Sequence, residues 1–376
     1  MIRKQEGFTM VELLIAMVVF VLTIAAASQL FVSLLTQFKQ QSKTAETQIE
    51  GIVGLETLRR DIEQAGYGLP WNIPAGVAYS EASGAPANAY NDSTTNPPRA
   101  VMSGNDAISN PVIGTSDYLV IKSTIISTNV SAPKWTYIVG TGAGLGNVKC
   151  WNATCDSPDD FTSTDRIIAL IPSRGESETS QRILVSNGAT FSVQFSGARN
   201  SFSPALQYDK YLIYGVDTAA DLRMPFNRAD YYVTTTPPAG FNIPPRCAPN
   251  TGLLVKSLIS HADGSRRPGM PLMDCVADME IIYGLDVNND GTITYFDNLN
   301  AMASYTAQTV RDQVKEVRVY ILSHEGQKDA SFNYTNNTVT VGEFGIGRNF
   351  DLSVIPDWQR YRWKVYTLVV QTRNLR

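Results

Sequence analysis

The sequence has little charge and few histidines, and each shortage excludes a class of protein. Charged residues make up 18% of the 376 residues, below the usual share of about 25%. The 31 basic and 35 acidic residues give a net charge of −4, which argues against a nucleic-acid binder with a basic face. The two histidines, His261 and His324, lie far apart in the chain. A histidine metal site or a Ser/His/Asp triad is therefore not favoured.

A long apolar run lies near the N-terminus. The 23 residues from Leu13 to Leu35 include only four polar ones, and as a helix they span about 35 Å, enough to cross a bilayer. Arg3 and Lys4 precede the run, so the N-terminus is expected to be cytoplasmic and the rest exported. A cleavable secretory signal is the alternative, but the run continues past its small residues at 25–27, which favours an anchor.

Glu12 lies at the start of this run, where an unpaired charge is costly. The residues Gly7-Phe8-Thr9-Met10-Val11-Glu12 resemble the class III signal of type IV pilins and pseudopilins. The resemblance implies that a membrane peptidase cuts between Gly7 and Phe8 and methylates the Phe8 amine. It also implies that Glu12 pairs with the N-terminal amine of a neighbouring subunit as the filament grows. A signal anchor that contains these residues by chance is the alternative.

The helix is expected to continue beyond the membrane. Apolar residues recur every three or four positions between Ile49 and Ala65, which is typical of a surface helix. Gly51 and Gly54 weaken it by about 1 kcal/mol each relative to Ala, and the Gly and Pro residues at 66–70 end it. The sequence therefore predicts a leader over 1–7, a transmembrane and assembly helix over 8–35 and an amphipathic continuation over 36–66.

Residues 67–376 predict a β-rich extracellular or periplasmic head. Loop insertions are expected at about 70–116 and 217–250, and a short helix between 299 and 312. Runs of β-branched and aromatic residues bounded by turn residues predict strands over 117–126, 134–139, 166–171, 182–195, 206–216, 253–259, 279–285, 314–322 and 362–371.

Four further segments make the resemblance specific to one type of pilin. Residues 58–66, 276–286, 318–322 and 361–367 resemble PilW-type minor type IV pilins, which are similar to the J-type minor pseudopilins of type II secretion. The resemblance covers the first 66 residues and roughly the last hundred. It implies an α+β, type IV pilin-like fold, with a long N-terminal helix packed on an enlarged antiparallel β-rich head.

The segment Asp286 to Asp297 follows the twelve-residue calcium loop. Asp297 replaces the usual bidentate Glu and is one methylene shorter, which lowers the expected affinity. The preceding residues predict a strand, so the loop would lack the paired helices of an EF-hand. A turn with solvated Asp side chains is the alternative. The expected Ca²⁺ ligands are Asp286, Asn288, Asp290, the Thr292 carbonyl, Thr294 directly or through water, and Asp297.

Four cysteines in an exported segment favour disulfides. Cys150 and Cys155 would form a local clip, and Cys247 and Cys275 would close a longer loop, although the sequence allows three pairings. A zinc site that uses all four is the alternative, but paired C-x-x-C spacings are missing.

Other motifs favour structural roles. The glycine-rich segment 140–146 does not fit a phosphate-binding loop and predicts a hairpin turn. The carboxylates at 159–160 and at 278 and 280 have no feature that marks a glycosidase pair. The tryptophans are expected in the core or clamping loops, rather than forming a sugar platform; these are Trp135, Trp151, Trp358 and Trp363.

The resemblance implies a non-enzymatic minor pilin that initiates or caps a type IV pilus within a tip or priming complex, because a head of about 300 residues would crowd a repeating lattice. Expected partners are other minor pilins, the major pilin, a tip adhesin and the prepilin peptidase, but no nucleic acid. The precursor would lie in the inner membrane and the mature protein in the pilus at the cell surface. A J-type pseudopilin, a pilus-displayed adhesin and a membrane-anchored enzyme are the alternatives, and the missing catalytic constellation disfavours the enzyme.

Overall fold

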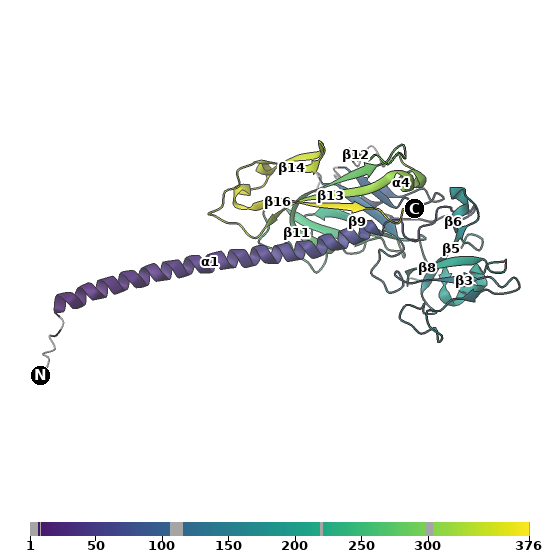
Figure 1. The fold of residues 1–376 in the computed structure, drawn as a ribbon, viewed down its shortest axis with the longest axis horizontal. Helices are drawn as coiled ribbons and strands as arrows, with labels where there is room; N and C mark the ends of the chain where they lie inside the picture. The colour runs from purple at the N-terminus through teal and green to yellow at the C-terminus, as the bar shows by residue number, and fades with distance from the viewer. Residues whose placement is uncertain (1–6, 8, 106–115, 219–220, 298–303, 376) are drawn as a thin grey trace.

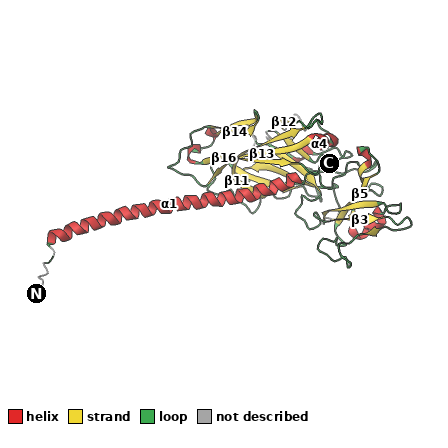
Figure 2. Cartoon of the chain, viewed as in Figure 1, coloured by secondary structure: helices red, strands yellow, loops and turns green. Residues whose placement is uncertain are grey.

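One long helix, α1, projects from a β-rich head (Figure 1). The computed structural model describes residues 7, 9–105, 116–218, 221–297 and 304–375. Helix α1 spans Met10–Glu63, and its residues 10–39 are exposed. Figure 2 shows that the head is built mainly of strands and loops, and its named strands pair antiparallel. This confirms the predicted α+β, pilin-like architecture.

The larger sheet forms the body of the head. Its strand order is β1-β2-β9-β10-β11-β13-β16, and β12 pairs with β11. The strands are β1 (Val101–Gly104), β2 (Tyr118–Ser123), β9 (Asn227–Thr234), β10 (Gly252–Leu258), β11 (Met270–Leu285), β12 (Thr294–Asp297), β13 (Val314–Glu325) and β16 (Arg362–Gln371).

A smaller sheet lies at the end of the head away from the N-terminus (Figure 1). Its strand order is β4-β3-β8-β5-β6, and β7 pairs with β5. The strands are β3 (Trp135–Val139), β4 (Asn147–Val148), β5 (Arg166–Ser173), β6 (Gln181–Leu184), β7 (Val193–Gln194) and β8 (Lys210–Asp217).

Short elements complete the head. Strands β14 (Thr338–Glu343) and β15 (Ile346–Asp351) form a separate hairpin. The short helices are α2 (Ala198–Phe202) and α4 (Ala307–Gln313), and the 3₁₀ turns are η1 (Ala87–Tyr90), η2 (Glu178–Ser180), η3 (Phe195–Gly197), η4 (Leu352–Val354) and η5 (Trp358–Arg360).

Hydrophobic clusters cover both faces of the larger sheet. On β13, Val317, Val319 and Ile321 belong to the cluster that includes Leu58 and Ile62 of α1. The alternate residues Tyr320 and Leu322 belong to a second cluster with Val341 of the hairpin. Side chains alternate across a strand, so α1 and the β14–β15 hairpin cover opposite faces.

The 217–250 prediction of a loop insertion is wrong in part, because β9 lies within it and every residue of this strand is buried. Its sequence, Asn-Arg-Ala-Asp-Tyr-Tyr-Val-Thr, carries two charges, and charged residues are rarely fully buried unless paired. The predicted 182–195 strand is also corrected, since β6 and β7 are separate strands. The predicted helix at 299–312 begins outside the described residues, and α4 occupies its later part.

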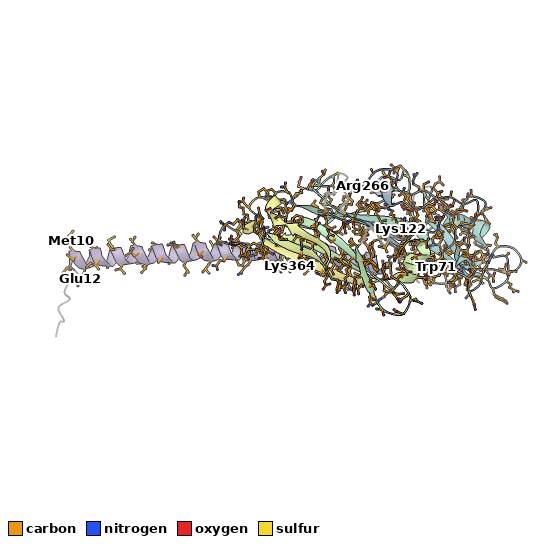
Figure 3. The ribbon with its side chains drawn as sticks, turned by 90° about the horizontal axis from the view of Figure 1, so that it is seen from above. Met10, Glu12, Trp71, Lys122, Arg266 and Lys364 are labelled. Atoms are coloured by element: carbon orange, nitrogen blue, oxygen red, sulfur yellow. A yellow bond between two sulfur atoms is a disulfide. The ribbon has the colours of Figure 1, made fainter. Side chains whose placement is uncertain are left out.

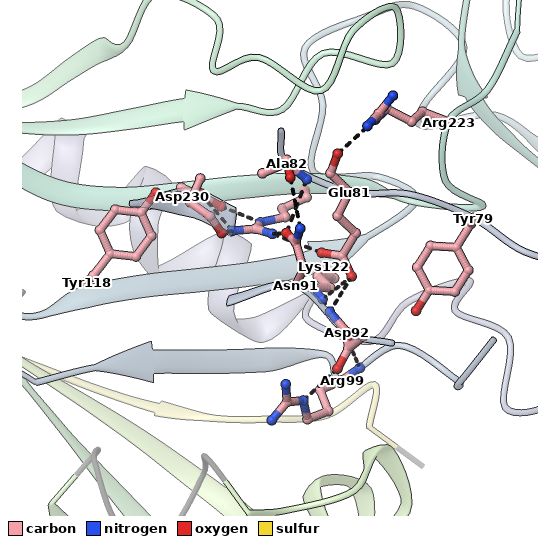
Figure 4. A network of polar contacts seen from close by, with 12 residues as sticks. Tyr79, Glu81, Ala82, Asn91, Asp92, Arg99, Tyr118, Lys122, Arg223 and Asp230 are labelled. Carbon is pink, nitrogen blue, oxygen red and sulfur yellow. Dashed lines mark hydrogen bonds and ion pairs between the residues drawn. The ribbon is translucent and has the colours of Figure 1, made fainter. Parts of the chain in front are cut away.

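The 70–116 segment does contain long loops, together with η1 and β1. Buried ion pairs fasten it to β2 (Figure 4). The Lys122 ammonium of β2 lies 2.7 Å from a Glu81 oxygen and 2.6 Å from an Asp92 oxygen, and Arg99 pairs with Asp92 at 2.6 Å. Although burial alone would raise it, the Lys122 charge holds the pKa of Asp92 below its ordinary value.

Arg228 extends this network on β9, with its side chain fully buried. The guanidinium contacts Asp230 at 2.7 Å and Glu81 at 2.9 Å, and it donates to the Ala87 carbonyl at 2.8 Å. Burial alone would lower the pKa of Arg228, but the two carboxylates raise it above its ordinary value. The charges of β9 thus compensate each other and are further paired with Glu81 of the loop segment, which explains how a charged strand occupies the core.

Helix α1 lies close to the larger sheet at Gly54. A Cβ atom on Gly54 would lie 1.8 Å from the Leu272 carbonyl oxygen of β11. Ile49 and Ile52, which were expected on the packed side, are exposed. Further along, Asp61 accepts hydrogen bonds from Tyr231 and from Lys256, the latter at 2.6 Å. The helix therefore contacts the sheet backbone closely at Gly54 and is fixed by the buried ion pair of Asp61 about two turns later.

We predict opposite effects for two neighbouring glycines. Gly54→Ala should lower the free energy of unfolding by about 1–3 kcal/mol or more, because the new methyl group overlaps a backbone oxygen. Gly51→Ala should be neutral or raise it by up to about 1 kcal/mol, since its Cβ would meet Met273 Cε at an ordinary 3.5 Å. Thermal unfolding of the full-length protein in detergent measures both; equal effects of the two substitutions would contradict the close contact.

The two histidines are buried and serve the fold. His324 Nε2 accepts a hydrogen bond from the Ala248 amide at 2.9 Å, and His261 Nε2 lies 3.2 Å from Asn227 Oδ1. Burial lowers the pKa of each histidine to about 4. Between pH 6.5 and 4 the unfolded chain binds protons that the folded one does not, so stability is complete above pH 6.5 and falls as the pH is lowered.

Each buried histidine should therefore lower the free energy of unfolding by roughly 3 kcal/mol as the pH falls from 6.5 to 4. His324→Gln retains a hydrogen-bond acceptor for Ala248 and removes the titration, so the difference in unfolding free energy between this variant and the wild type should change over pH 4–6.5. His261→Gln serves as the parallel case. Wild-type and variant curves that stay parallel through this range would show that neither histidine is neutral in the folded state.

Candidate functional site

The start of α1 places Glu12 in a hydrogen-bonded cap. Thr9 precedes the helix, and its hydroxyl oxygen accepts from the Glu12 amide at 3.3 Å. The Glu12 carboxylate in turn accepts from the Thr9 amide and hydroxyl, both at 3.0 Å. Gly7 is described and exposed, whereas the predicted N-methylation site, Phe8, lies outside the described residues.

This arrangement is a capping box, whose sequence signal is Thr-x-x-Glu ahead of an apolar run. Thr9-Met10-Val11-Glu12 carries that signal, and it could have been found from the sequence. Glu12 thus has a local partner in a single chain. Its negative charge also lies at the N-terminal end of the helix dipole, where anions are stabilised.

The helix beyond Glu12 carries a continuous apolar surface. Within the part of the chain that the structure describes, α1 is the one helix long and apolar enough, by length and composition, to cross a membrane. Figure 3 shows Met10 and Glu12 at the end of α1 that lies farthest from the head. This end can contact a bilayer or other helices without a clash from its own head.

The predicted calcium loop follows β11 and is folded back on its first residue. Asp286 Oδ1 accepts from the Asp290 amide at 3.0 Å, and its Oδ2 accepts from the Gly291 amide at 3.2 Å. Asp290 Oδ1 accepts from the Thr292 amide at 2.7 Å, and Asn288 Nδ2 donates to Asp290 Oδ2 at 2.9 Å. The structure therefore brings three of the predicted ligands into one tight loop.

The donor set of this loop fits a hard cation. The side chains of Asp286, Asn288 and Asp290 offer oxygen atoms, which Ca²⁺ prefers, and Gly291 has φ +86° at the sixth position, where a sharp turn is required. Lys315 Nζ lies 4.0 Å from Asp286 Oδ2 and partly balances its charge. The backbone of Asp297 pairs in β12 opposite Ile282, and its side chain lies outside the described set. Thr294 begins β12.

Comparison with protein families adds two matches. Residues 230–374 match the model of Type IV Pilus-assembly protein W (PilW). Residues 2–28 match the Prokaryotic N-terminal methylation motif, and this range includes Gly7, Phe8 and Glu12. Together the two matched regions correspond to a PilW-type prepilin. No curated protein and no solved structure matches it.

The two matches support a broad role for this chain. They support a type IV pilus minor pilin, which is a structural protein, and they imply a prepilin peptidase and other pilins as interaction partners. The signal and the apolar helix fit a precursor in the inner membrane that later enters the pilus. The PilW match begins inside β9, so it leaves the smaller sheet uncovered.

The cysteines of the head form two disulfides. Cys150 pairs with Cys155, and Cys247 pairs with Cys275. This resolves the three pairings that the sequence left open, and it excludes the zinc alternative for these four residues. Cys275 lies on β11 inside the PilW match, whereas the 150–155 clip belongs to the smaller sheet region outside it.

Proposed function

We propose that this protein joins a tip or priming complex that initiates or caps the type IV pilus. The observation that carries the proposal is the exposed apolar surface of α1, with a carboxylate at its start. In a bilayer this surface faces lipid, and in a filament it can face the corresponding helices of other subunits. A head of about 300 residues would crowd a repeating lattice, which favours a terminal position over a repeated one.

Exposed apolar residues on α1 also extend beyond the membrane segment. Ile49, Ile52 and Val53 are 65%, 62% and 63% exposed, although they lie beside the head. Ile49 and Val53 border an apolar groove that includes Phe241 and Met270. Contiguous exposed apolar residues commonly mark interaction surfaces. They support burial of this helix face by a neighbouring pilin subunit.

Glu12 would act through its charge in this complex. The capping box satisfies its hydrogen bonds in one chain, but it supplies no positive side chain in the apolar segment. The N-terminal amine of a neighbouring subunit would supply that charge, and a charge-assisted hydrogen bond is stronger than a neutral one. The same carboxylate would thus serve first as a helix cap and then as an intersubunit partner.

Two substitutions at Glu12 should separate these roles. Glu12→Gln keeps the capping box, because Gln occupies the same capping position as Glu, whereas Glu12→Ala removes both cap and charge. We expect both variants to be cleaved before Phe8 and to recover other minor pilins about tenfold less well in pull-downs, since each loses a charge-assisted bond. Mass spectrometry of the mature N-terminus checks the processing.

Wild-type recovery with Glu12→Gln, together with weak recovery for Glu12→Ala, would show that the cap and not the charge is required. A mature chain that begins after residue 27 would contradict the assembly role altogether, because most of the apolar helix would be removed. Gly7→Val, which should leave the precursor uncut, provides the unprocessed reference.

We further propose that Ca²⁺ stabilises the head through the loop at 286–297. Asp286 and Asp290 lie in the same tight loop, where a cation would balance their two negative charges. Asp286, Asn288 and Asp290 would bind through side chains, and Thr292, Thr294 and Asp297 would complete the set. Binding to the folded state alone raises stability by about 2.7 kcal/mol at a hundred times the dissociation constant.

Thermal unfolding of the full-length protein in detergent should occur at a higher temperature in millimolar calcium than in chelator, with a smaller gain from magnesium. Asp290→Ala should abolish the calcium effect. Asp263→Ala is a matched control, because Asp263 also accepts a turn hydrogen bond, from the Ser265 amide at 2.9 Å, but lies outside the loop. Superimposed curves for the wild type with and without calcium would identify the loop as an ordinary turn.

A further inference from the structure

Two tryptophans form an exposed corner on the smaller sheet. Trp135 is 38% exposed and Trp151 is 45% exposed. Their ring centroids lie 5.1 Å apart, with an angle of 74° between the ring planes. The sequence favoured core or clamping roles for both, but the core role holds for the buried Trp363 rather than for this pair.

The loop that carries Trp151 is held by several local bonds. The Cys150–Cys155 disulfide closes it, and Trp151 Nε1 donates to the Trp135 carbonyl at 3.1 Å. The buried Asp160 carboxylate accepts from the Trp151 amide at 2.9 Å and from the Ser157 amide at 3.1 Å. These bonds fix both the backbone and the indole edge of Trp151.

An indole that this loop exposes to solvent does not contribute the free energy that its burial would give. Burial of apolar surface is worth about 25 cal/mol per Å², and an exposed tryptophan forgoes much of that gain. The bonds that hold the loop therefore stabilise an arrangement that burial alone would disfavour. A pre-organised aromatic surface reduces the entropy lost when a ligand binds.

Polar and small groups surround the corner. It opens into a hollow of about 260 Å³ lined by Val130, Pro133, Lys134, Trp135, Trp151, Pro158 and Asp159. The Lys134 ammonium is 3.2 Å from Asp165, so its charge is already balanced. Asp159 is exposed and offers a carboxylate to hydroxyl donors. The hollow lies just below the range of about 300–1,000 Å³ that is usual for drug-sized ligands.

We propose that this corner binds a neutral saccharide, with one sugar ring against the Trp151 indole. A sugar ring presents C–H groups on one face and hydroxyls around its edge, which matches an aromatic surface beside a carboxylate and an ammonium. An anionic ligand fits less well, because Asp159 and the exposed Asp156 of the same segment are acidic. The smaller sheet lies at the end of the head away from the N-terminus (Figure 1), so the corner is remote from the assembly helix.

This binding function goes beyond assembly and is tested separately from it. Full-length protein in detergent should bind at least one neutral oligosaccharide from a panel built of glucose, galactose, mannose and N-acetylglucosamine, with a change in tryptophan fluorescence. Trp151→Ala should weaken that binding about tenfold or more, as truncation of a central tryptophan commonly does. Asp159→Ala should weaken it less, and Trp151→Phe should restore part of it.

Tyr208→Ala is the matched control, because Tyr208 is an aromatic residue of the same sheet region that is 76% exposed and does not line the hollow. It should bind like the wild type. Thermal unfolding of each variant checks that the fold is retained, and Asp159→Ala leaves the loop bonds described above in place. Failure of the whole panel to bind the wild type, or undiminished binding by folded Trp151→Ala, would overturn the proposal. The proposal would also be overturned if the corner bound a partner protein through Trp151 but bound no saccharide.

Discussion

The contact between Gly54 of α1 and the Leu272 carbonyl of β11 sets the relation between the helix and the head. A side chain at this position would hold the helix away from the strand. The missing side chain brings Leu58 and Ile62 into the same cluster as Val317 and Val319, and it brings Asp61 within hydrogen-bond distance of Lys256. The free, apolar half of α1 therefore extends from a head to which the other half is rigidly packed, as an assembly helix requires.

The sequence predicted the parts of the fold whose side chains follow a simple period. Helix α1 and strands such as β13 and β16 have regular apolar patterns that predict the elements themselves. The pattern also predicts the buried face of β13, but it does not predict the exposure of Ile49 and Ile52 on α1. Strand β9 was missed because Arg228 and Asp230 interrupt its apolar run, and the compensating charge of Glu81 lies about 150 residues earlier in the chain. Asp230 pairs with Arg228 within the strand, but the pairing of Arg228 with Glu81 is long-range and leaves no local signal. Gly54 was interpreted only by its helix propensity, since its contact with β11 is also long-range.

In the candidate site, too, the features with a local sequence signal could be predicted, and those that depend on tertiary contacts could not. Gly7, Phe8 and Glu12 could be predicted because their signal is contiguous, and the methylation-motif match includes them, while their roles in cleavage and pairing remain predictions. The capping role of Glu12 was equally local and could have been predicted from Thr9. The position of Trp135 and Trp151 at the surface could not, because it depends on how a disulfide-closed loop folds over β3. The loop at 286–297 has a local signal for its geometry, while its metal remains a prediction.

The buried charges around Lys122 and Arg228 have a consequence for the surroundings in which the head can remain folded. Dissolved ions screen charges at the surface within about 8–10 Å at moderate ionic strength, but they screen buried pairs much less. The exposed pair of Lys328 and Asp357 should weaken in concentrated salt, whereas the attachment of the 79–99 segment to β2 and β9 should not. An exported head whose long loop is held in this way can pass between dilute and saline water with that loop in place.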